Sequence, residues 1–263
     1  EMITQRIFLD EKKRKDPKEK KKKKGKKDEP EEPKPEMSDK QKKRDKHFRV
    51  LVTGSSKSFV QKYIAIFKSA KINLQAIDTE AFALIRALVG KDRSAIMILD
   101  IGSRRTNITI VEKGIPFVNR SINIGGDTVT GRLVDSMQIP LDEAERLKRD
   151  LGTMGNAKSN LPGGLSKLLE PVMQPLINEI HYAIQLYAKM ELTELKKIDK
   201  IILTGGSSHL PRVPEYLAEV LNMNVYRGDP WARVVYPKDL DSVLEEIGPR
   251  MSVAIGLAMR DMD

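Results

Sequence analysis

The clearest pattern of apolar positions lies in the middle of the chain. Residues 95–99 are all apolar and lead to Asp100, and apolar residues resume at 108–111 after a turn that contains Gly102. Two short apolar runs on either side of a turn predict a β-hairpin with a buried first strand. We therefore expect the rest of the fold to be organised around this hairpin.

The spacing of apolar residues predicts further elements along the whole chain from residue 48 onward. Gly114 and Asn119 are expected to mark turns of an antiparallel meander, and Thr79 or Asp78 is expected to cap a helix. The predicted strands are 48–53, 72–77, 115–118, 120–124, 198–203 and 224–226, and the predicted helices are 59–67, 79–89, 125–137, 140–152, 165–195, 210–223 and 251–259.

Composition narrows the class of protein. The chain has 263 residues, of which 40% are hydrophobic and 5% aromatic, so aliphatic side chains and Met must fill its core. It has no Cys, which excludes disulfides, thiolate chemistry and Cys-ligated zinc, and its three His show no paired spacing. No apolar run approaches the ~18 residues of a membrane span, so we expect no transmembrane segment.

The net charge of +10 is concentrated near the start of the chain. Residues 1–48 hold 19 Lys and Arg against 12 Asp and Glu. The stretch 11–46 consists largely of Lys, Glu, Pro and Asp, a composition that predicts disorder. It is either an electrostatic arm for nucleic acid or anionic lipid, or a solvated insertion. Because it lacks aromatic residues that would stack on bases, we favour the insertion and do not expect nucleic-acid binding.

The turn after Asp100 has the chemistry of an anion site. Gly102 allows close approach of the backbone to a ligand, and successive N–H groups in a turn can surround an anion. Thr106 adds a hydroxyl, and the Asp100 carboxylate could hold a hydrated Mg²⁺ beside phosphates. The alternative is an ordinary hairpin with an Asp-x-Gly turn.

A second apolar strand further along the chain also leads into glycine. The run 198–203 leads into Gly205 and Gly206, and helical segments separate it from the first turn. This arrangement resembles the phosphate-2 and adenosine motifs of the actin/Hsp70/sugar-kinase ATPase superfamily. The chain most resembles the FtsA-like PilM family of type IV pilus assembly over residues 49–263, through the stretches LDIGSRRTNITIV, IPFVNRSINIGGDTVT, AERLKRDLG, IILTGGSSHLP and VAIGLAMR.

The resemblance implies an α/β, actin-like ATPase fold, in which a ribonuclease H-like domain has a mixed sheet and flanking helices. Residues 1–46 would be a remnant of the first domain with the Lys-rich insertion. Residues 47–93 would form a β-α-β-α unit like subdomain 1C, and residues 94–263 would form the second actin-like domain. The phosphate-1 loop of the first domain is not in this sequence, so we expect most of that domain to be missing.

The resemblance also implies ATP and Mg²⁺ as cofactors. Glu145 would accept hydrogen bonds from the ribose and Lys148 would flank the base; the alternative for this pair is a surface ion pair. The helix that begins near residue 125 either points its N-terminus at phosphate or is simply capped. The implied nucleotide-binding residues are Asp100, which would also bind Mg²⁺ through water, with Gly102, Ser103, Thr106, Gly125, Gly126, Glu145, Lys148, Gly205, Gly206 and Ser207.

Two features of the proposed site depart from the superfamily pattern. Ser103, Arg104 and Arg105 stand where small residues are common, and an arginine here either pairs with the β- or γ-phosphate or faces solvent. With the phosphate-1 loop missing, we expect weak or no ATP binding by this chain. The complete protein would be at most a slow ATPase that acts as a conformational switch.

The implied partner is the short cytoplasmic peptide of PilN, together with other proteins of the pilus platform. Phe59, Tyr63 and Phe67 are candidates for a peptide contact, although core packing explains them better. The protein would be cytoplasmic and associated with the inner membrane through these partners. The alternatives are a sugar-kinase-type phosphotransferase and an FtsA-like division protein; the second would need a basic amphipathic tail that residues 248–263 lack.

Overall fold

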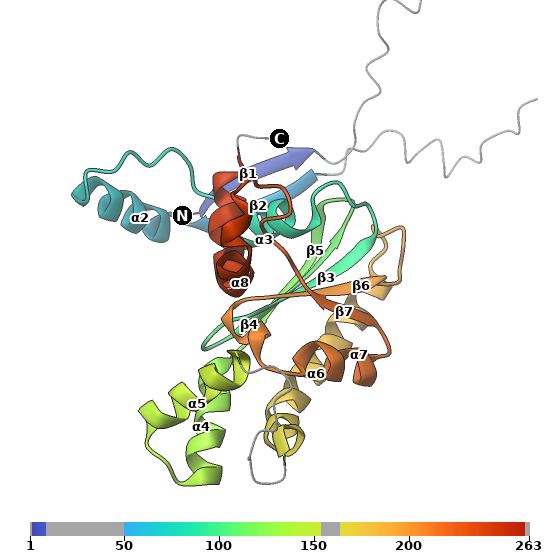
Figure 1. Ribbon diagram of the computed structural model, residues 1–263. Coiled ribbons are helices and arrows are strands. Elements are labelled where there is room, and N and C mark those ends of the chain that lie inside the picture. The colour runs from blue at the N-terminus through green and yellow to red at the C-terminus, as the bar shows by residue number, and fades with distance from the viewer. Residues whose placement is uncertain (1, 9–49, 154–163, 261–263) are drawn as a thin grey trace, which may run out of the picture. The chain divides into compact units, whose positions relative to one another are not determined.

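The computed structural model describes residues 2–8, 50–153 and 164–260 (Figure 1). The predicted disorder of 11–46 and the predicted loop at 153–164 therefore lie almost wholly outside the described residues. The chain divides into two compact units, Glu1–Ile77 and Asp78–Asp263. None of the helices in the described ranges is both long and apolar enough to cross a membrane.

The first unit contains a two-stranded sheet and one helix. β1 (Met2–Phe8) pairs with β2 (Val50–Ser56) in antiparallel register, and α2 (Lys57–Ser69) follows at once. The Ser56 hydroxyl accepts a hydrogen bond from the Phe59 N–H at 3.3 Å and caps the helix. The predicted strand at 72–77 is wrong, because this segment has no regular structure.

Helix α2 is confirmed where the apolar spacing predicted it, but it does not pack as a core helix. None of its residues is buried. Phe59 is 52% exposed and Tyr63 is 42% exposed, and their rings contact each other with centroids 4.9 Å apart. Phe67 is only half-buried. Core packing, the explanation favoured from the sequence for these three aromatic residues, is therefore wrong for Phe59 and Tyr63.

The second unit is built on a five-stranded mixed sheet with the strand order β5-β4-β3-β6-β7. β3 pairs antiparallel with β4 and parallel with β6. The predicted hairpin is confirmed. β5 is one continuous strand, so the predicted turn at Asn119 is wrong: Asn119 pairs with Thr109 within the ladder. The strands are β3 (Ala95–Ile101), β4 (Thr106–Glu112), β5 (Ile115–Ile122), β6 (Lys200–Thr204) and β7 (Asn224–Arg227).

Helices cover both faces of this sheet (Figure 1). Alternate residues of β3 explain this, since Met97 and Leu99 join one core cluster and Ile96 and Ile98 join the other. The first cluster includes α6 (Gly164–Lys189) and α7 (Val213–Leu221), and the second includes α3 (Glu80–Leu84), the π-helical turn η2 (Ile85–Val89) and α8 (Asp241–Ala258).

Two further helices, α4 (Gly126–Met137) and α5 (Leu141–Thr153), pack on each other around a small cluster that includes Leu133 and Ala144. The glycine-containing turn η3 (Gly206–His209) follows β6, and η4 (Lys238–Leu240) precedes α8. α8 is longer than predicted and includes Pro249. Helices α4 and α5 are confirmed within a residue or two of the predicted ranges, whereas α8 begins ten residues earlier than predicted.

One glycine allows α8 to approach α3 closely. A Cβ added to Gly256 would fall on the carbonyl group of Ala83, which is backbone and cannot move aside without separating the helices. Gly131, in the interior of α4, offers a comparison because a Cβ there would meet nothing within 4 Å.

We predict that Gly256→Ala lowers the free energy of unfolding of the second unit by about 1–3 kcal/mol or more, because the helices must shift. Gly131→Ala should instead raise it by about 0.5–1 kcal/mol, as expected for glycine replaced in a helix. Urea unfolding followed by the fluorescence of Trp231, the only Trp of the chain, measures both. Equal stability of the two variants would contradict this account of the α3–α8 contact.

Candidate functional site

The two glycine-containing turns identified in the sequence meet at one edge of the sheet. β3 and β6 are parallel neighbours, and Asp100 pairs in register with Thr204. The turns that follow these residues are therefore adjacent. The Ser207 hydroxyl donates a hydrogen bond to the Gly102 carbonyl oxygen at 3.0 Å, which joins them directly.

Glycine is required where these segments approach each other. Gly205 has φ +83°, and a Cβ there would lie 2.5 Å from both Asp100 Oδ1 and the Ile101 carbonyl oxygen. A Cβ on Gly125 would lie 2.5 Å from the Ser103 carbonyl oxygen. Gly125 and Gly205 are thus explained by the packing of the turns themselves, independently of any ligand.

The start of α4 is attached to the first turn. The Gly126 N–H donates to the Gly102 carbonyl oxygen at 2.9 Å, and the Asp127 N–H donates to the Ser103 carbonyl oxygen at 2.7 Å. These two N–H groups at the helix start are satisfied by protein oxygens. Of the two possibilities raised by the sequence for this helix, a phosphate-facing N-terminus or a capped one, the hydrogen bonds favour the second.

Glu145 and Lys148 of α5 face the same junction. Lys148 Nζ donates to Glu145 Oε2 at 2.6 Å, to Thr130 Oγ1 at 2.8 Å and to the Gly126 carbonyl oxygen at 3.2 Å, and its side chain is only 12% exposed. Since an ammonium group has three donors, all of those of Lys148 are engaged. It positions Glu145 and the start of α4, and has no donor left for a ligand.

Unlike Lys148, whose donors are all used, Glu145 can still accept a hydrogen bond. Its side chain is 33% exposed, and its Oε1 accepts one hydrogen bond, from Arg149 at 3.2 Å. Burial would raise the pKa of Glu145, but hydrogen bonds from Lys148 and Thr130 outweigh this and lower it, so the side chain is ionised at neutral pH. Glu145 Oε1 can thus accept a further hydrogen bond from a ligand hydroxyl.

On the other side of the junction, Asp100 is held in a setting that disfavours its charge. Burial, together with the negative charge of Glu80, raises its pKa to about 6, although a hydrogen bond from Asn107 acts in the opposite direction. A divalent cation or a hydrogen-bond donor next to Asp100 would favour its ionised form.

Glu80 is a candidate that sequence reasoning missed. It is the first residue of α3, where a carboxylate is common for helix stability alone, so the sequence gave no signal. Packing of α3 brings its carboxylate close to Asp100, and Glu80 Oε2 accepts a hydrogen bond from Asn107 Nδ2 at 3.2 Å.

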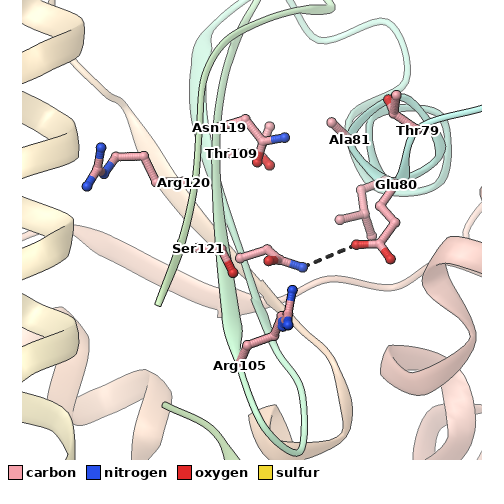
Figure 2. Close-up of a pocket in the computed structure, with 10 residues that line it drawn as sticks. Thr79, Glu80, Ala81, Arg105, Thr109, Asn119, Arg120 and Ser121 are labelled. Atoms are coloured by element: carbon pink, nitrogen blue, oxygen red, sulfur yellow. Dashed lines mark hydrogen bonds between the residues drawn. The ribbon is translucent and has the colours of Figure 1, made fainter. Parts of the chain in front are cut away.

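A polar cavity of about 360 Å³ adjoins these residues (Figure 2). Glu80 and Leu84 of α3, with the N-cap residue Thr79, line one wall, and residues of β4 and β5 line the opposite one. Arg105 extends into it from the turn between β3 and β4 (Figure 2). In the part of the chain that the structure describes, no group of three or more His, Asp or Glu side chains is arranged to hold a metal ion by itself.

The remaining predicted site residues have different surroundings. The Thr106 hydroxyl is buried and donates to the Ile124 carbonyl oxygen at 2.8 Å, so it anchors the turn. Ser103 is exposed at the tip of the turn. Gly206 lies next to Arg250, whose Cγ would be 3.5 Å from an added Cβ. The structure therefore brings all the predicted nucleotide-binding residues together, but Thr106 and Lys148 point their polar atoms at the protein.

The raised pKa of Asp100 predicts a measurable pH dependence. Between pH 3.8 and about 6 the folded state holds a proton that the unfolded state has lost, so this group lowers stability as pH rises and its cost is complete above pH 6. We expect Asp100→Asn to raise the melting temperature at pH 8 and to change it little at pH 4.

Asp92 supplies a control of opposite sign. A hydrogen bond from Lys200 at 2.6 Å lowers its pKa to about 2, so its charge stabilises the fold above pH 3.8. Asp92→Asn should lower the melting temperature at pH 8. If Asp100→Asn lowers the melting temperature at pH 8 as Asp92→Asn does, the account of Asp100 is wrong.

The family model described as type IV pilus assembly protein PilM matches residues 36–262. The cell division protein FtsA of Neisseria meningitidis is 28% identical over 236 residues, which cover 79% of this chain and 52% of FtsA. FtsA of Borreliella burgdorferi is 25% identical over 233 residues, covering 80% and 53%. The chain thus spans about half the length of the curated relatives it matches.

Solved structures agree on the fold. A chain of the PilM–PilN type IV pilus biogenesis complex superposes with a TM-score of 0.69 at 20% identity, covering 100% of this chain and 67% of that one. MreB5 of Spiroplasma citri bound to AMPPNP gives 0.57 at 15% identity, covering 79% and 66%. The predicted actin-like α/β fold is therefore confirmed. Since the family model spans most of the sequence, the chain belongs to the PilM family of type IV pilus assembly proteins.

Proposed function

We propose that this chain is the nucleotide-binding part of a PilM-type scaffold, and that ATP·Mg²⁺ occupies the junction of the two glycine turns. One observation carries the proposal: the Gly102 carbonyl joins the turn after β3 to the turn after β6, with Glu145 on one side and Asp100 on the other. A ligand that spans this junction meets a hydrogen-bond acceptor at one end and a cation-binding carboxylate at the other.

The nucleoside lies at the α5 end in this proposal. Glu145 accepts hydrogen bonds from the ribose hydroxyls, because its Oε1 retains acceptor capacity and its charge is favoured. Lys148 fixes the position of Glu145, and the adenine lies against Gly206 and Ser207. The sequence-based assignment had Lys148 flanking the base; in this proposal its role is to position Glu145, because its three donors are used within the protein.

The phosphates lie at the Asp100 end. The N–H groups of Ser103 and Arg104 donate to no backbone acceptor within the described ranges, so the tip of the turn offers them to an anion. Asp100 would hold Mg²⁺ through water. The positive charge of the cation would favour the ionised form of Asp100, which burial disfavours. Mg²⁺, when bound, neutralises charge on the phosphates.

Glu80 is the candidate for orienting a water molecule near the terminal phosphate. Its carboxylate accepts a hydrogen bond from Asn107 and lines the cavity (Figure 2), and it is close enough to Asp100 to raise the pKa of that residue. Slow hydrolysis would then serve to change conformation rather than to make product, as expected for a switch. Since this chain spans about half of its curated relatives, part of the nucleotide contact is expected from elsewhere in the complete protein.

We predict weak, millimolar binding of ATP·Mg²⁺ that depends on Glu145. At 10 mM ATP·Mg²⁺ and a dissociation constant near 1 mM, binding would stabilise the fold by about 1.4 kcal/mol, a shift of about 3–6 °C in melting temperature. Glu145→Ala should remove most of this shift. Glu143→Ala, on the same helix but exposed, should leave it unchanged.

The ribose contact has its own control. ATP that lacks both ribose hydroxyls should bind the wild-type chain more weakly than ATP, whereas Glu145→Ala should bind the two equally. No shift with ATP·Mg²⁺ at 10 mM would contradict nucleotide binding by this chain. A preference for the ribose hydroxyls that survives in Glu145→Ala would remove Glu145 from the site.

For a partner, we propose a PilN-type cytoplasmic peptide that binds along α2. One solved neighbour is a chain of a PilM–PilN complex, and here α2 exposes apolar side chains that a partner could cover, among them Phe59, Tyr63, Ile64 and Ile66. Through such a peptide and other platform proteins the chain would be held at the cytoplasmic side of the inner membrane.

We predict that the double variant Phe59→Ser/Tyr63→Ser weakens binding of a synthetic PilN-type N-terminal peptide at least tenfold, measured by fluorescence anisotropy. Tyr182→Ser is the matched control, because Tyr182 is also an exposed aromatic residue, at 50%, but belongs to the second unit. Equal effects of the two variants would argue against α2 as the peptide site.

A further inference from the structure

Two neighbouring arginines in the turn between β3 and β4 have different surroundings. Arg104 Nε lies 3.7 Å from Asp127 Oδ2, and the Arg104 side chain is 88% exposed. Arg105 is exposed as well, but it lines the cavity beside α3, and no ion pair joins it to another residue in the described ranges. The structure thus separates two residues that the sequence left equivalent.

Among the described residues, Arg105 lines the cavity and has no carboxylate partner. Arg120 also lines the cavity, but its guanidinium donates to Glu179 and lies 4.6 Å from the centroid of the Tyr182 ring. Figure 2 shows the Arg120 side chain pointing away from the cavity and the Arg105 side chain pointing into it. The other lining side chains are mostly hydroxyl and amide groups of Thr79, Thr109, Asn107, Asn119 and Ser121.

Arg105 and Glu80 extend into the same space without touching. Glu80 Oε2 accepts from Asn107 Nδ2 at 3.2 Å, which fixes its direction, and no ion pair joins Glu80 to Arg105. The cavity of about 360 Å³ would hold roughly ten waters at their liquid volume. A phosphoryl group with several waters therefore fits between the guanidinium and the carboxylate.

The backbone beneath Arg105 is well anchored. The Gly102 N–H donates to the Arg105 carbonyl oxygen at 3.0 Å, and the next residue, Thr106, is buried with its hydroxyl bound to the Ile124 carbonyl oxygen. Asn107 is paired in register with Asp100, so the cavity is one strand away from the proposed Mg²⁺ ligand. The Arg105 side chain therefore extends from an anchored backbone, at the end of the proposed phosphate site.

We propose that Arg105 is the specificity-determining residue that distinguishes a nucleoside triphosphate from a diphosphate, by binding the terminal phosphate in this cavity. The inference rests on the proposed function, since it names the phosphate that reaches Arg105. A guanidinium presents two parallel N–H groups that match phosphate oxygens, which makes arginine suited to this role. Arg104 does not take part, because it is paired with Asp127 at the surface.

The test compares Arg105→Ala with Arg104→Ala in the full chain, by titrating ATP·Mg²⁺ and ADP·Mg²⁺ in thermal-shift measurements. The wild-type chain should bind ATP more tightly than ADP. Arg105→Ala should weaken ATP binding about tenfold to a hundredfold and leave ADP binding unchanged, as expected for loss of a charged hydrogen bond to phosphate. Arg105→Lys should recover part of the difference, and Arg104→Ala should match the wild type.

The outcomes separate this inference from the proposed function. If the wild-type chain binds neither nucleotide, the proposed function fails and this inference with it. If both nucleotides bind but Arg105→Ala weakens them equally, or weakens neither, the proposed function stands and Arg105 does not recognise the terminal phosphate. If only Arg104→Ala weakened ATP binding, the terminal phosphate would be bound by Arg104 instead, and the inference would be overturned as well.

Discussion

The Gly102 carbonyl oxygen accepts hydrogen bonds from the Gly126 N–H and the Ser207 hydroxyl, two groups from segments far apart in the chain. A carbonyl oxygen has two lone pairs, so this one is fully used. The contact is possible only because a side chain is lacking where the segments meet: a Cβ on Gly126 would lie 2.6 Å from Ser207 Oγ, and one on Gly205 would fall against Asp100 and Ile101. The site is therefore a consequence of backbone packing at the sheet edge.

Around this contact, charge is distributed unevenly. At the α5 end, Lys148 is saturated and favours the ionised form of Glu145, so that end presents a stable acceptor. At the α3 end, burial and the negative charge of Glu80 raise the pKa of Asp100, and Arg105 has no ion-pair partner among the described residues. The charges at the α5 end are paired within the protein, whereas those at the α3 end have no ion-pair partner among the described residues. A ligand with one neutral, polar part and one charged part matches this difference. A conformational switch that responds to the charged part would act at the α3 end.

Local patterns were sufficient for most of the elements. The continuous apolar run at residues 95–99 reflects a strand buried on both faces, and the sheet contains that strand at its centre. Errors arose where local and tertiary preferences differ. Asn119 is a common turn residue, but pairing with β4 keeps it in the ladder. Apolar residues at 72–77 suggested a strand that has no partner in the structure, and the apolar stripe of α2 suggested a core that its unit does not provide.

The sequence by itself determined the order of elements, the two strand ends that carry glycine, and the family, because these depend on residue types at short spacing. Only the tertiary structure decided which polar atoms remain open at the site. Thr106 and Lys148 have suitable chemistry, but their polar atoms are satisfied within the protein. Glu80 gave no sequence signal, and the sequence left Arg104 and Arg105 equivalent, yet the tertiary structure places Glu80 and Arg105 around one cavity. Hydrogen-bond saturation and side-chain direction depend on contacts between residues distant in sequence, and spacing along the chain does not encode them.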